Sequence, residues 1–226
     1  YSVSPLISER QDPLWEKKYL VVKLGETETE IFTKLRKKTR YTIRRLEKTL
    51  NIVEGKEYVM PFHDIYKTRM SAKNLPAKPL QYFKTLISEL DGARLFVALK
   101  GGRVIAGMIF CRLDNVAYYL YNSACSEGLK LSANHLLMWK SLCYFNTNGV
   151  ECVDLGESIE GSGTYLFKKT HFNGVMRTQE YTDIIGHTHS NNQKLELNVR
   201  RSLQYRTAKI VPKAFAISLA SYNQIL

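Results

Sequence analysis

Residues Arg94–Tyr121 have the sequence RLFVALKGGRVIAGMIFCRLDNVAYYLY, three apolar runs separated by two pairs of turn-forming residues. Gly101-Gly102 follows the first run and tolerates positive φ, and Asp114-Asn115 follows the second run. Short turns of this kind join neighbouring antiparallel strands. The segment therefore predicts a three-stranded antiparallel meander.

A helix is predicted upstream of the meander. Thr27 is followed three residues later by Glu30, the capping-box arrangement of a helix start. Apolar residues then recur at helical spacing, with Thr39 in the gap, and predict one long helix. These residues are Ile31, Leu35, Ile43, Leu46 and Leu50. The other faces of this predicted helix are strongly basic.

Further elements are expected on both sides of the meander. Before it we expect a strand at 19–22 and helices at 61–73 and 79–90; after it, a helix at 132–148, strands at 150–155 and 176–185, and a polar helix at 191–206. This order is typical of an α+β domain with a mixed sheet. We expect one domain over 1–190, with an irregular entry and the first strand in 1–24, and a helical tail at 191–226.

Charge and composition restrict the class of partner. Lys and Arg number 33 against 21 Asp and Glu, and the formal net charge of +12 favours an anionic partner such as tRNA, a nucleotide-linked precursor, a CoA thioester or an anionic membrane surface. No apolar stretch approaches the roughly 20 residues that cross a bilayer. The four cysteines lack CxxC spacing and are interpreted as buried free thiols, which predicts a cytoplasmic location, including the inner face of the membrane.

Four segments, in this order, resemble the C-terminal acyltransferase domain of the FemABX and BioF2-like families. They are KKTRYTIRR at 37–45, IYKTR at 65–69, YYLYNSA at 118–124 with NHLLMW at 134–139, and VDLG at 153–156 with GTYLFKK at 163–169 and FNG at 172–174. Their order and spacing together carry the resemblance, which implies a GNAT-type acyltransferase fold. Family proteins of the peptidoglycan branch contain two such domains, so we expect an upstream domain before Tyr1.

The resemblance assigns the chemistry to Lys168. Transfer to an amine passes through a tetrahedral oxyanion, which a nearby cation stabilises, and the matching lysine of the family is placed near the reacting groups or the substrate phosphate. Asp154, at the end of a predicted strand, is expected to orient Lys168 or to act as a base, with Glu157 as its substitute. The alternatives are a solvated Lys168 and an aspartate that only caps the loop.

Basic and aromatic residues are expected to bind substrate. Arg40 and Arg44 lie one helical turn apart and suit a pyrophosphate, with Tyr41 beside them for stacking; the alternative is a solvated basic face. The resemblance adds two further candidates, Arg69 after an aromatic residue and Phe167 in the phenylalanine-lysine signature.

Alternation along the last strand of the meander predicts that Tyr119 and Tyr121 share one face, with Tyr118 and Leu120 on the other. One of these pairs is expected to line the cleft. The resemblance favours Tyr121 as a substrate-binding residue, and the alternative is a buried tyrosine with a satisfied hydroxyl.

The acyl donor is constrained by one departure from the wider fold. GNAT enzymes that use acyl-CoA carry a glycine-rich loop for the pyrophosphate, but 125–132 has the sequence CSEGLKLS, with a single glycine. This favours aminoacyl-tRNA over acetyl-CoA as donor. His187 and His189 lack a completing set of ligands, so neither a metal nor a tightly bound cofactor is expected.

Three functions remain open at this point. The first is transfer of an aminoacyl or acyl group to an amine of a cell-envelope precursor. The second is an acyl-CoA-dependent N-acyltransferase of polysaccharide or lipid biosynthesis, and the third is a non-catalytic RNA-binding or scaffold domain.

Overall fold

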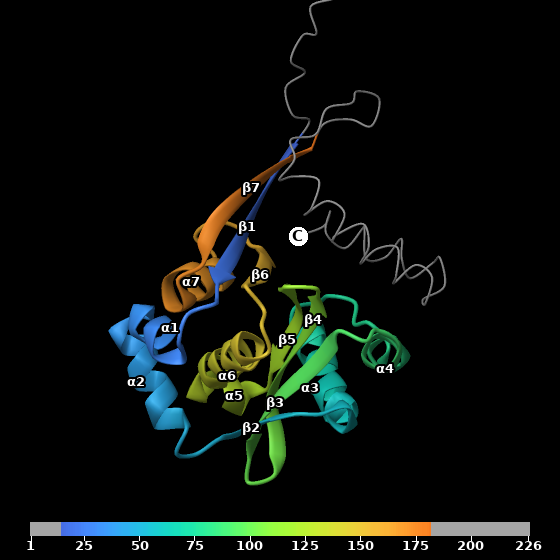
Figure 1. Cartoon of the computed structure of the whole chain (residues 1–226). Coiled ribbons are helices and arrows are strands. Elements are labelled where there is room, and N and C mark those ends of the chain that lie inside the picture. The colour runs from blue at the N-terminus through green and yellow to red at the C-terminus, as the bar shows by residue number, and fades with distance from the viewer. Residues whose placement is uncertain (1–14, 182–226) are drawn as a thin grey trace, which may run out of the picture.

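The computed structural model describes residues 15–181, which form a seven-stranded sheet with helices on both faces (Figure 1). The strands lie in the order β2-β3-β4-β5-β6-β1-β7, and all neighbours are antiparallel except β5 and β6. The predicted mixed sheet is confirmed. The strands are β1 (Trp15–Lys23), β2 (Asn51–Glu54), β3 (Ala93–Lys100), β4 (Arg103–Leu113), β5 (Val116–Ala124), β6 (Cys152–Glu157) and β7 (Val175–Tyr181).

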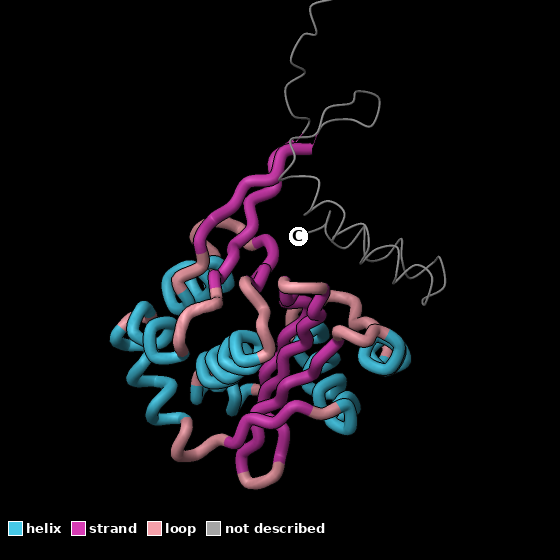
Figure 2. Tube along the Cα trace, in the orientation of Figure 1, coloured by secondary structure: helices cyan, strands magenta, loops and turns pink. Residues whose placement is uncertain are grey.

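The sheet divides the apolar core into two layers, and helices cover both of its faces (Figure 2). One layer packs under α1 (Glu28–Lys34), α2 (Lys37–Leu46), α6 (Ala133–Thr147) and α7 (Gly163–Leu166), and the other under α3 (Val59–Ser71) and α4 (Leu80–Glu89). Three shorter helices complete the described residues: a 3₁₀ turn at Lys56–Tyr58, α5 (Ser126–Leu131), and the π-helix η2 (Phe167–His171).

The predicted meander is confirmed as β3, β4 and β5. Gly101 and Gly102, with φ of 55° and 78°, form the first turn, and Asp114, with φ of 52°, forms the second. Both turns need left-handed backbone, which glycine adopts without strain and aspartate tolerates. The two turn pairs therefore fix the register of the central strands.

The predicted long helix is two helices. The Thr27–Glu30 capping box is present, but α1 ends at Lys34, and Leu35 and Arg36 are extended before α2 begins. The buried positions Leu35 and Thr39 keep a four-residue spacing across this break, so the periodicity does not reveal it. Strand β2 and helix α5 were not predicted, because each is short and only partly buried. The helix expected at 191–206 lies outside the described residues.

Strand β5 carries a bulge that changes which side chains share a face. Ile109 pairs with Tyr121 while the next residue, Phe110, pairs with Tyr119, so Leu120 is an extra residue on β5. Tyr119 therefore packs in the α6 layer and Tyr121 in the α3 and α4 layer. The prediction that these two tyrosines share a face is wrong, because simple alternation does not continue through a bulge.

Strands β5 and β6 separate just before this bulge. They pair in parallel only from Val116 with Cys152 to Tyr118 with Asp154. On the other side of β6, β1 and β7 form a ribbon that extends beyond the rest of the sheet (Figure 1). The later parts of β5 and β6 are thus free to present side chains between them.

Candidate functional site

Lys168 is buried although its side chain carries an amine. The residue is 3% exposed, and its Nζ donates to the carbonyl oxygen of Glu157 at 2.9 Å and of Gly156 at 3.5 Å. Burial lowers the pKa of Lys168 to about 8, against the charges of Asp154 and Glu157, which raise it. The amine therefore points into the protein, whereas the neighbouring Lys169 is exposed.

Asp154 combines the two roles that the sequence leaves open. It is 6% exposed at the end of the β5–β6 pairing, and its Oδ1 accepts from the backbone N–H of Gly156 at 2.7 Å. This contact caps the turn in which Gly156 has φ of 71°. Its charge also acts on the Lys168 amine. Asp154 therefore both caps the loop and interacts with Lys168.

Tyr119 closes this group from β5. The Lys168 Nζ lies 5.7 Å from the centroid of the Tyr119 ring, within the range of a cation–π contact. Burial raises the pKa of the Tyr119 hydroxyl, and a hydrogen bond with Asn122 opposes that shift. Tyr119 is therefore neutral at physiological pH, and the group of Tyr119, Asp154 and Lys168 occupies the point where β5 and β6 separate.

The π-helix η2 places Lys168 in this group. A π-helix is rare and is frequently found at functional sites, and Lys168 is the buried residue of η2. The turn after η2 is bonded back to this helix: the Gly174 N–H donates to the Lys168 carbonyl at 3.1 Å. Phe172, which lies between these two residues, is fully buried. The backbone of Lys168 is thus held on both sides.

The predicted substrate-binding residues of α2 lie on its outer faces. Arg40 donates through Nη1 to the Thr33 carbonyl at 2.9 Å, and the Arg44 guanidinium lies 5.3 Å from the centroid of the Phe32 ring. Tyr41 is 69% exposed. Both arginines therefore pack against α1 and still present charge at the surface.

The remaining predicted residues lie in different layers. Tyr121, on the face opposite Tyr119, places its hydroxyl 2.8 Å from that of Tyr82 on α4. Arg69 is half-buried in the last turn of α3, which covers the same face as Tyr121. Phe167 packs in the α6 layer, with its ring centroid 5.2 Å from that of His135. The structure therefore groups Phe167 with the Lys168 segment, and Tyr121 with α3 and α4.

Two histidines that the sequence analysis did not select lie beside this segment. His171, the last residue of η2, has its Nδ1 2.8 Å from Thr39 Oγ1 on α2 and 3.3 Å from His135 Nε2 on α6. A usable signal was Thr39 itself, a polar residue on an otherwise apolar stripe. This contact connects the basic helix to the Lys168 segment.

A protein-family model described as an acetyltransferase (GNAT) domain matches residues 33–169. The chain belongs to the GNAT acetyltransferase family. This match spans α2, the meander, β6 and Lys168, and it confirms the expected fold and the expected class of protein, an acyltransferase. Together with the fold match to FemX, it confirms the resemblance to FemABX-like proteins.

Three solved structures similar to this GNAT domain have longer chains. FemX is 12% identical, with a TM-score of 0.63 over 80% of this chain and 63% of that chain. The C-terminal domain of a putative lysylphosphatidylglycerol synthetase from Agrobacterium fabrum is 13% identical, with a TM-score of 0.51 over 73% of this chain and 59% of that chain. L-PGS from Bacillus licheniformis is 13% identical, with a TM-score of 0.53 over 81% of this chain and 64% of that chain.

These similarities establish the fold. The chain spans less than two thirds of the length of each of these three proteins. No curated protein matches the sequence.

The helix that follows β5 in this GNAT domain has an acidic first turn. Glu127 of α5 forms ion pairs with Lys100, at 2.6 Å, and with Arg103, both on the β3–β4 hairpin. Cys125 N–H donates to the Ile105 carbonyl at 2.9 Å, and a Cβ on Gly128 would lie 2.3 Å from that same oxygen. The start of α5 therefore packs on β4, and its carboxylate is paired with two cations of the β3–β4 hairpin.

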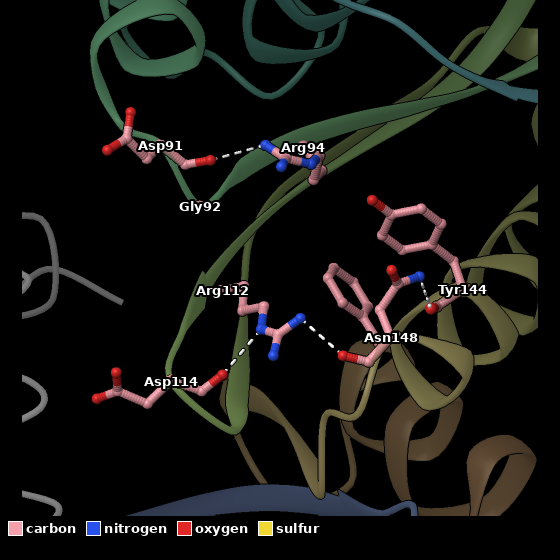
Figure 3. A pocket seen from close by; sticks show the side chains of 8 residues that line it. Asp91, Gly92, Arg94, Arg112, Asp114, Tyr144 and Asn148 are labelled. Carbon is pink, nitrogen blue, oxygen red and sulfur yellow. Dashed lines mark hydrogen bonds between the residues drawn. The ribbon is translucent and has the colours of Figure 1, made fainter.

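A cavity of about 360 Å³ lies at the other end of β4, against the last turn of α6 (Figure 3). Its two arginines hold the backbone: Arg94 donates to the Asp91 and Ala93 carbonyls, and Arg112 donates to those of Asp114 and Asn148, all at 2.7–2.8 Å. None of the predicted site residues lines this cavity. We therefore interpret both arginines as structural residues that hold the ends of β3, β4 and α6 together.

Within the described residues, no three His, Cys, Asp or Glu side chains gather as metal ligands would. His187 and His189 lie outside those residues. The described helices are also all too short or too polar to cross a membrane.

Proposed function

We propose that this GNAT domain transfers an aminoacyl group from aminoacyl-tRNA to an amine of a cell-envelope precursor. The observation that carries the proposal is the buried amine of Lys168 between Tyr119 and Asp154, because a desolvated cation stabilises an oxyanion far more strongly than an exposed one.

The chemistry follows from this arrangement. The acceptor amine, as the free base, attacks the ester carbonyl carbon, and the carbonyl oxygen becomes an oxyanion. Lys168, largely protonated at pH 7 with a pKa of about 8, stabilises that charge. The C–O bond to the ribose then breaks, and the ribose oxygen takes up the proton that the attacking nitrogen loses. The charge of Asp154 acts on Lys168, and we propose this carboxylate as the carrier of that proton.

The choice of aminoacyl-tRNA over acyl-CoA rests on two features. The segment 125–132 has a single glycine where acyl-CoA enzymes carry a glycine-rich pyrophosphate loop, and that residue, Gly128, packs closely against the Ile105 carbonyl. Helix α2 has five Lys and Arg residues and no acidic residue between Lys37 and Leu46, which suits a polyanion. Arg40, Arg44 and Tyr41 are our candidates for contacts with the donor or with the precursor phosphates.

The acceptor has a second candidate. The similarity to a putative lysylphosphatidylglycerol synthetase favours a lipid headgroup, in which the acceptor is a hydroxyl rather than an amine. Peptidoglycan precursors and phosphatidylglycerol are both anionic, so the positive charge of the chain suits either one. We place the enzyme in the cytoplasm, at the inner face of the membrane.

The test is a transfer assay with the full-length protein, labelled aminoacyl-tRNA and each acceptor in turn. Lys168→Ala should reduce kcat by about a hundredfold or more, as loss of an oxyanion contact does, and leave tRNA binding intact. Lys169→Ala is the matched control, because that exposed neighbour donates to the Tyr165 hydroxyl instead. Equal activity of the two variants would contradict the mechanism, and transfer from acyl-CoA alone would establish the second enzyme function.

A further inference from the structure

Thr39 is a polar residue on the apolar stripe of α2. With Ile43 and Leu46 it forms the buried face of that helix, and it is fully buried. A buried hydroxyl requires a hydrogen-bond partner. That partner is His171, whose Nδ1 lies 2.8 Å from the Thr39 hydroxyl oxygen.

Thr39, His135 and His171 form a hydrogen-bonded cluster, and the Ser132 carbonyl next to it determines where the protons lie. His135 Nδ1 lies 3.3 Å from the Ser132 carbonyl, which can only accept, so His135 carries its proton on Nδ1 and accepts at Nε2. His171 Nδ1, 3.3 Å from that Nε2, is then the donor and shares its proton between His135 and the Thr39 hydroxyl. One N–H thus connects α2, α6 and the end of η2.

The cluster is uncharged near neutral pH. Burial, together with the charges of His171 and Lys38 and against the Ser132 hydrogen bond, lowers the pKa of His135 to about 4. Burial also lowers the pKa of His171, as do Arg36 and Lys38 on α2. The aromatic rings of Phe167 and Phe172 cover the other sides. Neutral rings make this contact a fixed support rather than a switch at physiological pH.

We propose that Thr39 and His171 are positioning residues for Lys168, and that they hold the π-helix against α2 so that the amine stays between Tyr119 and Asp154. A π-turn is intrinsically unfavourable, and a buried ammonium gains free energy by moving into water. The backbone of η2 therefore needs an external anchor at its end, and His171 lies three residues after Lys168. The inference rests on the proposed function only for the role of Lys168 in transfer.

The first experiment measures Lys168 itself, without any substrate. Competitive labelling of lysine amines with an anhydride over a pH series, read by mass spectrometry, gives the pKa of an amine from the midpoint and its accessibility from the plateau. In Thr39→Val we expect the Lys168 midpoint to rise by about one pH unit or more, toward that of an exposed lysine, and the plateau to increase. Thr39→Ser should restore both values.

Two comparisons separate positioning from a general loss of structure. Thr42→Val removes a hydroxyl from the same helix that bonds the Lys38 carbonyl at 2.9 Å, and it should leave Lys168 labelling unchanged. Should Thr39→Val fail to fold, His171→Asn and His171→Leu replace it, because the Asn amide lies near the position of Nδ1 and Leu has no polar group. A Lys168 midpoint that stays at the wild-type value in a folded Thr39→Val or His171→Leu protein would overturn the proposal.

The transfer assay then connects the anchor to the reaction. If Lys168 acts as proposed, Thr39→Val should lower kcat by about tenfold with little change in KM, because a misplaced group loses its transition-state interaction. If Thr39→Val alters Lys168 labelling but the wild-type protein transfers nothing, the proposed function is wrong and the positioning role of Thr39 stands. If the wild-type protein transfers normally but Thr39→Val leaves Lys168 labelling unchanged, the positioning role alone is wrong.

Discussion

The amine of Lys168 lies 5.7 Å from the centroid of the Tyr119 ring and donates its hydrogen bonds to two backbone carbonyls, those of Gly156 and Glu157. Ring and carbonyls are neutral partners, and the charges of Asp154 and Glu157 act on the amine without offsetting its burial. The cation is thus held in place yet only partly neutralised. This arrangement makes Lys168 sensitive to pH, to polarity and to small movements of its backbone.

Transfer should lose rate as the pH rises through about 8. The pKa of Lys168 is about 8, so above that pH the amine is neutral and stabilises an oxyanion poorly. The pH profile of kcat/KM measures this directly. In Lys168→Arg, whose guanidinium stays charged, the residual rate should not fall in this range. Because the acceptor amine must also be a free base, the profile is divided by that of Lys168→Arg, which shares the acceptor titration. A ratio of wild-type to Lys168→Arg activity that increases through pH 8 would instead identify the Lys168 amine as a base.

Replacement of Lys168 by Met should not destabilise the protein. The folded-state pKa of about 8 lies below the ordinary value of 10.5, so the folded protein binds fewer protons than the unfolded chain between these values, and stability rises with pH there. Below pH 8 the buried charge costs stability. At pH 7 we expect the free energy of unfolding of Lys168→Met, measured in urea, to equal the wild-type value or to exceed it by up to about 2 kcal/mol. This difference should shrink as the pH approaches 10.5. A clear loss of stability at pH 7 would argue that the amine is structural.

Gly174→Ala should damage both the fold and the transfer reaction. A Cβ at this position would lie 2.9 Å from the Lys168 carbonyl oxygen and 3.3 Å from Leu20 Cβ. Overpacking of this kind costs about 1–3 kcal/mol, and it moves the backbone of Lys168. Denaturant unfolding and the transfer assay test this, with Gly163→Ala as control, because a Cβ there meets no atom within 4 Å. Equal behaviour of the two variants would contradict the close packing of the turn.

Arg44→Ala should weaken tRNA binding and its salt dependence. Loss of one phosphate contact reduces the slope of log K against log salt concentration by about one. Lys84→Ala, on α4 at the other face of the sheet, is the matched loss of one exposed cation. Filter binding at several salt concentrations measures both variants. If the slope changes equally in both, α2 is not the binding surface.

The sequence was sufficient to predict the central strands, and it was insufficient to predict how the candidate site residues are arranged. Turn residues such as Gly101 and Asp114 have local conformational reasons that can be recognised directly, so the meander was predicted correctly. The bulge at Leu120 depends on pairing with β4, and alternation within one strand cannot indicate it. This is why Tyr119, rather than Tyr121, is the tyrosine beside Lys168.

The same limit applies to the Thr39, His135 and His171 cluster. These residues come from three helices and meet only after the sheet has formed. Each one alone is unremarkable in sequence, and spacing within a helix cannot reveal a contact between helices. Lys168 was identified through the resemblance of its motif, whereas its burial could be learned only from the structure.

The short parallel pairing of β5 with β6 divides the sheet into two parts, β2-β3-β4-β5 and β6-β1-β7, and we call this pairing the seam. Three residue pairs across that seam hold few interstrand hydrogen bonds, so local opening there requires less free energy than in the long antiparallel pairs on either side. Amide hydrogen exchange should therefore be fastest, among the central strands, at Leu155, since the Gly156 N–H is held by Asp154. The part of the sheet that opens most easily is then the part that carries Asp154 and Lys168, and we expect it to open without disturbing the meander.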